Sequence, residues 1–224
     1  MLISGGLRRI KMKITIVYDN EAYKKDLKAD WGFSCLVEIE NTPKILFDTG
    51  ANGSILLYNM KKLDIDPMII DEIFISHYHG DHTGGLSGFL KINKDVKVYV
   101  PSSFSVSRGA KEVISIKDSF QIHENVFSTG ELRGIEQSLA VKTEKGIVVI
   151  AGCSHSGVGN ILNAASKFGN VYALIGGLHG FREFGLLKDL DLVCATHCTQ
   201  FKSEIKKLYP EKYIEGGAGK VIVV

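Results

Sequence analysis

The stretch SHYHGDHTGG spans residues 76–85 and places three histidines and one aspartate within six consecutive positions. The whole chain contains only seven histidines. The apolar residues Ile73, Phe74 and Ile75 directly precede the stretch and are typical of a short buried strand, so the polar side chains would follow a strand end. Imidazole and carboxylate groups are ligands for cations such as Zn²⁺, Mn²⁺ and Fe²⁺. We therefore expect a metal site here rather than a histidine-rich surface turn.

The spacing within the stretch predicts two groups of ligands. His77 and His79 point to the same side of an extended backbone, so both can reach one ion. Asp81 and His82 follow Gly80, where the chain can turn and direct them at a second ion. Two cations about 3.5–4 Å apart can share a hydroxide and stabilise both the attacking and the leaving oxygen of a displacement. The stretch thus indicates a site for one or two divalent metal ions.

The motif H-x-H-x-D-H followed by T-G-G resembles that of the metallo-β-lactamase superfamily. LFDTG, which ends in Asp48-Thr49-Gly50, resembles its first motif, whose aspartate supports the metal ligands from behind. ATHCT, which contains His197, resembles its last motif, which supplies a histidine to the second metal. The resemblance implies an αββα sandwich with the site at one edge of two sheets. It also implies a metal-dependent enzyme, with zinc expected first and manganese, iron or magnesium as alternatives.

The middle of the chain departs from the common pattern of that superfamily. The turn FSTGELRG at 127–134 has no histidine, and the strand-like run 146–152 leads into Cys153 and His155 where many members have an aspartate. GCSHSG, IGGLHG and THCT resemble a narrower branch, named after a 7,8-dihydropterin-6-yl-methyl-4-(β-D-ribofuranosyl)aminobenzene 5'-phosphate synthase. Cys153 is either a ligand in the place of the bridging aspartate or a buried structural thiol. Because no bridging carboxylate is found there, an enzyme with a single metal ion remains an alternative.

The predicted ligands therefore fall into two groups. By the resemblance, the first metal is assigned to His77, His79 and His155. The second is assigned to Asp81, His82 and His197, with Cys153 as a further candidate. Asp81 would also orient the attacking hydroxide.

Other polar residues receive separate predictions. His179, in IGGLHG, is expected to contact the substrate or transfer a proton, with a structural role or metal ligation as alternatives. His123 lies in a polar stretch and is interpreted as an exposed bystander. Arg133 and Arg182 either hold a phosphate or are solvated surface residues.

Periodicity predicts strands and helices in alternation. Strands are expected at 13–19, 33–40, 44–50, 72–76, 96–100, 135–143, 146–152, 171–177, 192–196 and 220–224. Helices are expected at about 54–63, from Thr83 onward, at 157–168 and at 202–209. Two rounds of strands and helices predict an α/β fold of two mixed sheets packed face to face, with helices outside. No Ser- or Pro-rich linker divides the chain, so we expect one domain over 12–224 and a flexible extension at 1–11.

Composition narrows the environment and the partners. The 27 basic and 25 acidic residues give a formal charge of +2, which indicates neither a nucleic-acid nor a membrane partner. No apolar run is long enough for a membrane span, and the first residues are not typical of a secretory signal. We therefore expect a cytoplasmic protein with a small-molecule substrate, and a homo-oligomer is compatible with the sequence. The four cysteines are expected to be reduced, with Cys35, Cys194 and Cys198 packed in the core.

Two enzyme reactions are compatible with the ligand set. In a hydrolase, a metal-bound hydroxide would attack a phosphoester, thioester or lactone. The narrower resemblance instead implies a transferase that joins a pterin-methyl group to an aminobenzene ribofuranosyl phosphate and displaces pyrophosphate. A non-catalytic, metal-dependent ligand sensor is a third hypothesis, which a lack of turnover by metal-loaded protein would favour.

Overall fold

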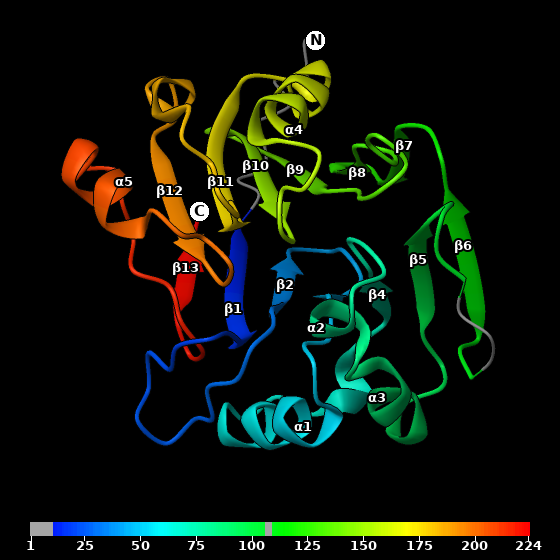
Figure 1. Cartoon of the computed structure of the whole chain (residues 1–224). Coiled ribbons are helices and arrows are strands. Elements are labelled where there is room, and N and C mark those ends of the chain that lie inside the picture. Colours follow the sequence, from blue (N-terminus) through cyan, green and yellow to red (C-terminus); the bar gives the residue numbers. More distant parts are fainter. Residues whose placement is uncertain (1–10, 106–108) are drawn as a thin grey trace, which may run out of the picture.

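The computed structural model describes residues 11–105 and 109–224. In these ranges the chain forms two β-sheets that pack face to face, with helices on the two outer surfaces (Figure 1). The expected α/β sandwich of four layers is therefore confirmed. The predicted extension at 1–11 falls outside the described residues except for Lys11, and it stays a prediction.

The first sheet has seven strands in the order β13-β1-β2-β3-β4-β5-β6. In that order the strands are Val221–Val223, Met12–Tyr18, Ser34–Ile39, Ile45–Phe47, Glu72–Phe74, Lys97–Pro101 and Glu112–Ile116. The strands from β13 to β3 pair antiparallel, and those from β3 to β6 pair parallel. The sheet is thus mixed, as expected.

The second sheet has six strands in the order β12-β11-β10-β9-β8-β7. In that order the strands are Leu192–Thr196, Val171–Gly177, Gly146–Ala151, Leu139–Thr143, Val126–Ser128 and Phe120–His123. The pairs β12–β11 and β11–β10 are parallel, and the remaining pairs are antiparallel. This sheet is mixed as well.

Alternating side chains explain why the sheets are covered on both faces. In β3, Ile45 and Phe47 point into the core between the sheets, whereas Leu46 packs on the helix side. In β10, Val148 likewise faces the first sheet and Val149 faces the opposite outer layer. A strand buried on both faces is a continuous apolar run, and burying these side chains from water is the main stabilising term of such a sandwich.

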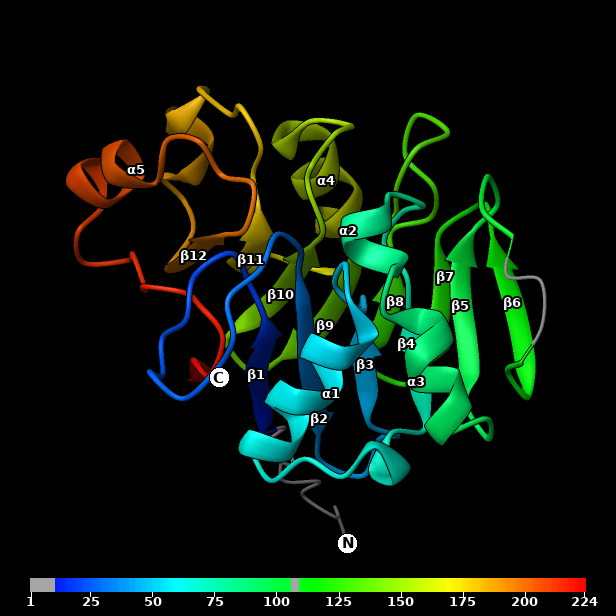
Figure 2. The same ribbon diagram turned by 60° about the horizontal axis from the view of Figure 1, so that its bottom comes forward.

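The helices form the two outer layers. The α-helices are α1 (Gly53–Lys62), α2 (Gly80–Thr83), α3 (Leu86–Ile92), α4 (Val158–Ala165) and α5 (Lys202–Leu208). Short 3₁₀ turns span Pro67–Ile69, Ser166–Phe168 and Phe184–Leu187. Helices α1 and α3 cover the first sheet and come to the front in Figure 2, whereas α4 and α5 lie on the second sheet. Helix α1 begins after Asn52, whose side chain accepts the Ser54 backbone N–H.

Most predicted elements occur within a residue or a few of their expected bounds, but the stretch from 112 to 139 differs. Strands β6, β7 and β8 carry polar or exposed residues and were not predicted. The expected strand 135–143 begins only at Leu139, because 132–136 form a turn in which Leu132 and Glu136 pair. In the two described ranges, no helix has the length and apolar character needed to cross a membrane.

Candidate metal centre

The candidate site lies where strands of both sheets end. Asp48, Ser154, His179 and His197 each follow a strand end by one to three residues, and each has a positive φ, between 47° and 60°. A non-glycine residue rarely adopts this left-handed conformation. Here four residues at strand ends adopt this conformation. The resulting turns direct polar side chains into one region, at the carboxyl ends of the parallel strands.

The first cluster consists of His77, His79 and His155. One potential ligand atom from each lies within 4.8 Å of the others. His77 Nε2 is 3.1 Å from His79 Nδ1, and the His155 ring centroid is 4.9 Å from that of His77. The structure therefore brings together the three side chains assigned to one ion, from the loop after β4 and the loop after β10.

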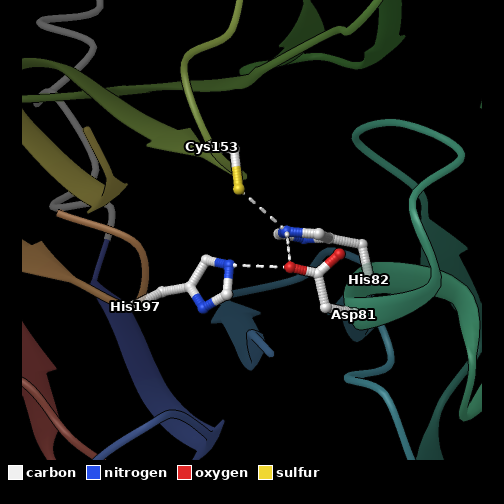
Figure 3. A group of neighbouring side chains, drawn as sticks. All are labelled: Asp81, His82, Cys153 and His197. Atoms are coloured by element: carbon white, nitrogen blue, oxygen red, sulfur yellow. Dashed lines mark hydrogen bonds and ion pairs between the residues drawn. The ribbon is translucent and has the colours of Figure 1, made fainter. Parts of the chain in front are cut away.

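The second cluster consists of Asp81, His82, Cys153 and His197 (Figure 3). Asp81 Oδ2 is 3.3 Å from His197 Nε2 and 3.8 Å from His82 Nε2. Cys153 Sγ is 3.1 Å from His82 Nε2. Figure 3 shows the four side chains converging from α2, from the end of β10 and from the end of β12. The cysteine thus lies among the other three rather than apart from them.

The two clusters are neighbours. The rings of His77, in the first, and His82, in the second, have centroids 4.2 Å apart. Both side chains are fully buried. The two clusters therefore lie side by side.

A hydrogen-bond network fixes one histidine in each cluster. Asp48 Oδ2 lies 2.7 Å from His82 Nδ1 and also accepts the Ser76 hydroxyl at 2.7 Å. Since the Ser76 hydroxyl donates to Asp48, its oxygen can accept a hydrogen bond from His77 Nδ1, 2.9 Å away. Both histidines then carry their proton on Nδ1 and present the Nε2 lone pair to a cation. Asp48 thus contacts His82 directly and reaches His77 through Ser76.

His197 has an equivalent partner in Asn20. Asn20 Oδ1 lies 2.9 Å from His197 Nδ1, and Asn20 Nδ2 donates to the His197 backbone oxygen at 3.1 Å. This pair orients the ring so that Nε2 faces Asp81. Sequence reasoning missed both Asn20 and Ser76.

The local electrostatics favour the protonation states that bind cations. Burial lowers the pKa of His77 and of His82 well below the usual value, so both are neutral imidazoles. Burial also lowers the pKa of His155. Partial burial works to raise the pKa of the Asp81 carboxyl, but the neighbouring imidazoles of His197 and His82 outweigh it and hold that pKa below its usual range.

The donors present fit divalent metal ions. Nε2 of His155 and Nε2 of His197 are buried and have no hydrogen-bond partner among the described residues. A buried polar atom without a partner is rare and indicates a missing ligand. Three imidazoles, and an imidazole pair with one carboxylate and one thiol, are donor sets that zinc and iron accept.

Cys153 has a second cysteine beside it. Cys198 Sγ lies 3.3 Å from Cys153 Sγ, and both residues are buried. The Cys198 contact, followed by burial, raises the pKa of the Cys153 thiol. Cys35 and Cys194 are buried in the core between the sheets, as expected, whereas Cys198 packs against the candidate site.

A pocket of about 530 Å³ opens beside the first cluster. Its lining includes His155, His179 and Arg182 but not Arg133. His179 is exposed, and its ring centroid lies 5.0 Å from that of His155. The pocket therefore opens beside His155, one of the predicted ligands of the first cluster.

The interpretation of His123 as an exposed bystander is wrong. His123 Nε2 lies 2.8 Å from Glu72 Oε2, and the histidine side chain is only 26% exposed. Glu72 is buried at the amino end of β4 and needs a partner for its carboxylate. No pattern around His123 indicated this pairing, because 51 positions separate the two residues.

The model of the metallo-β-lactamase superfamily matches residues 32–158, more than half of the chain. The chain belongs to the metallo-β-lactamase superfamily. Two crystal structures of that fold superpose on nearly the whole of this chain. Tm1679, described as a metal-dependent hydrolase of the β-lactamase superfamily, has a TM-score of 0.75 and 25% identity, covering 94% of this chain and 98% of its own. YhfI from Bacillus subtilis has a TM-score of 0.68 at 12% identity, covering 96% and 100%, and supports the fold alone.

Sequence similarity extends to a named enzyme of the superfamily. The 7,8-dihydropterin-6-methyl-4-(β-D-ribofuranosyl)-aminobenzene-5'-phosphate synthase of Methanocaldococcus jannaschii is 29% identical, over 97% of this chain and 98% of its own. The metallo-β-lactamase resemblance drawn from the H-x-H-x-D-H motif is thus confirmed. Like its relatives, the chain is an enzyme of this metal-dependent class.

Proposed function

We propose that the protein is a metal-dependent hydrolase that uses two adjacent cations on a phosphoester, thioester or lactone of a small molecule. The observation that carries the proposal is the adjacency of two ligand clusters, with the His77 and His82 rings 4.2 Å apart, at the edge of a pocket of about 530 Å³. A pocket of this volume suits a small molecule.

His77, His79 and His155 would hold one ion. Asp81, His82, Cys153 and His197 would hold the other, with zinc as the metal that this mixed donor set favours. Cations bound there supply Lewis acidity, which lowers the pKa of water and neutralises developing negative charge.

The chain's own residues would position the reactants. The ionised Asp81 carboxylate can accept a hydrogen bond from the attacking water and hold its lone pair toward the substrate. His179 stands exposed in the pocket beside His155, where a ring nitrogen can donate a proton to the leaving group. Arg182 lies on the pocket wall with its guanidinium 4.1 Å from the centre of the Phe201 ring, and it can hold an anionic part of the substrate.

A transferase is the second candidate, and a specific observation favours it. The similarity to the Methanocaldococcus jannaschii synthase runs through both chains from end to end. By that likeness, the reaction would join a pterin-methyl group to an aminobenzene ribofuranosyl phosphate and release pyrophosphate. The leaving group would be anionic, and the same clusters would stabilise it.

A substrate panel separates the two candidates. Zinc-loaded protein is incubated with a phosphodiester, a thioester, a lactone and a dihydropterin-methyl pyrophosphate, the last with and without the aminobenzene acceptor. Turnover of one of the first three supports the hydrolase. Pyrophosphate release that requires the acceptor supports the transferase instead. If metal-loaded protein turns over none of these, the enzymatic proposal is wrong for these substrates, and a ligand sensor becomes the better account.

A further inference from the structure

Trp31 occupies an unusual position. It is the only tryptophan of the chain, it lies in the connection between β1 and β2, and 58% of it is exposed. Its ring centroid lies 5.3 Å from that of His197. An aromatic side chain exposed to this extent contributes little by burial, so core packing does not explain why it lies here.

The indole nitrogen of Trp31 contacts a candidate ligand directly. Trp31 Nε1–H donates to Asp81 Oδ2 at 3.0 Å. This is the carboxylate oxygen that lies 3.3 Å from His197 Nε2 and 3.8 Å from His82 Nε2, so it faces the interior of the second cluster. A carboxylate oxygen can accept a hydrogen bond with one lone pair and coordinate a cation with the other. The contact thus fixes which oxygen of Asp81 faces the cation site.

Two hydrogen bonds hold the backbone that directly follows Trp31. Phe33 N–H donates to the Asp81 backbone oxygen at 3.2 Å, and Gly32 N–H donates to Asn20 Oδ1 at 3.0 Å. Asn20 is the residue that also orients His197. Gly32 has a φ of 146°, and a Cβ there would lie 2.6 Å from the Asp81 backbone oxygen, so only glycine permits this approach. The indole is therefore presented from a fixed backbone rather than from a loose surface loop.

We propose that Trp31 is a positioning residue for the second metal ion. Its N–H fixes the Asp81 carboxylate with Oδ2 directed at the space between His82, Cys153 and His197, before a cation arrives. Holding a ligand in its bound orientation beforehand removes an ordering cost from cation binding. Outer hydrogen-bond partners of metal ligands affect affinity by about 10- to 100-fold when they are removed. The inference rests on the ligand assignment made under the proposed function.

The test removes the N–H and keeps the shape of the ring. Because Trp31 is the only tryptophan, biosynthetic replacement of tryptophan by benzothienylalanine, in which sulfur stands for the N–H, alters this position alone. The binding of two equivalents of zinc is then measured by competition with a chromogenic chelator. We expect one of the two equivalents to lose about tenfold in affinity and the other to stay unchanged. Trp31→Phe should give a loss of similar size, since it also lacks the donor.

Tyr23 provides a matched control. It is an exposed aromatic residue in the same β1–β2 connection, and its ring contacts Lys220 rather than a candidate ligand. Tyr23→Phe should bind both equivalents as the native protein does. In native protein, Trp31 fluorescence should change as the site beside it fills and should not respond to filling of the other.

The outcomes separate this inference from the ligand assignment. If native protein takes up two zinc ions and the benzothienylalanine protein binds both equally tightly, the role of Trp31 is overturned and the assignment stands. If native protein takes up no second ion, both are overturned. If Tyr23→Phe loses as much affinity as Trp31→Phe, the effect belongs to the loop in general, and the positioning role is wrong.

Discussion

Asp48 Oδ2 lies 2.7 Å from His82 Nδ1, and both side chains are fully buried. The same carboxylate accepts the Ser76 backbone N–H at 2.7 Å and the Ser76 hydroxyl at 2.7 Å. Through Ser76 it reaches His77, which belongs to the other cluster. One buried aspartate therefore sets the ring orientation of a histidine on each side of the candidate centre.

Asp48→Asn should weaken metal binding while leaving the fold intact. The asparagine amide nitrogen can only donate, so where it faces His82 Nδ1 it moves the imidazole proton to Nε2 and removes the lone pair that a cation needs. We expect about 10- to 100-fold weaker zinc binding, measured by chelator competition. Asp95→Asn is the control, because Asp95 is exposed and pairs with Lys111 rather than with a candidate ligand. Unchanged affinity in Asp48→Asn would contradict the proposed role of the network.

His155→Ala should lose one zinc equivalent. His155 is the single imidazole from the second sheet that joins His77 and His79, and its buried Nε2 has no other partner among the described residues. Elemental analysis should show one equivalent where native protein shows two. His123→Ala should keep both, because His123 pairs with Glu72 instead. Full metal content in His155→Ala would show that the first cluster is assigned wrongly.

The pH dependence of metal affinity tests whether Cys153 is a ligand. Its thiol has a raised pKa and is protonated without metal, so coordination must displace its proton. The affinity for the ion beside Cys153 should therefore increase with pH more steeply in native protein than in Cys153→Ala. The difference should be about a factor of ten per pH unit, because one additional proton is displaced. Cys194→Ala should keep the native slope, because Cys194 lies in the core between the sheets. Equal slopes in native protein and Cys153→Ala would favour a buried structural thiol.

Acid should destabilise the metal-free protein. The pKa values of the buried His77 and His82 are lowered from 6.5, so the folded state stays unprotonated where the unfolded chain takes up protons. The contribution of these neutral histidines to the free energy of unfolding is fully present above about pH 6.5, the pKa of an unfolded histidine. It is lost as the pH falls below that value, by about 1.4 kcal/mol per pH unit for each histidine. Urea unfolding of metal-free protein at about pH 7.5 and about pH 5.5 measures the difference. Equal free energies of unfolding would mean that these imidazoles accept protons in the folded state.

The sequence predicts the parts of the site that are local in the chain. His77, His79, Asp81 and His82 are recognisable from their spacing, and the apolar run 73–75 predicts the strand that leads into them. Asn20 and Trp31 are not recognisable in this way. Asn20 meets His197 across 177 positions, and Trp31 meets Asp81 across 50, so only the folded chain brings them together.

The same distinction explains the differences in the fold. Strands β6 and β7 form a mostly exposed edge of the two sheets, where residues such as Val113 and Phe120 stay open to solvent. An exposed edge strand lacks the continuous apolar run that marks a strand buried on both faces, so the apolar pattern does not predict it. Glu72 and His123 pair across the two sheets, which no local pattern encodes. Cytoplasmic location, a homo-oligomer and the absence of a nucleic-acid partner stay predictions.

Two metal ions are expected to bind side by side in this centre. Crystals of zinc-loaded protein, measured on both sides of the zinc absorption edge, test this expectation most directly. We expect two anomalous peaks, one between His77, His79 and His155, the other between Asp81, His82, Cys153 and His197. A single peak, or peaks away from these side chains, would contradict it.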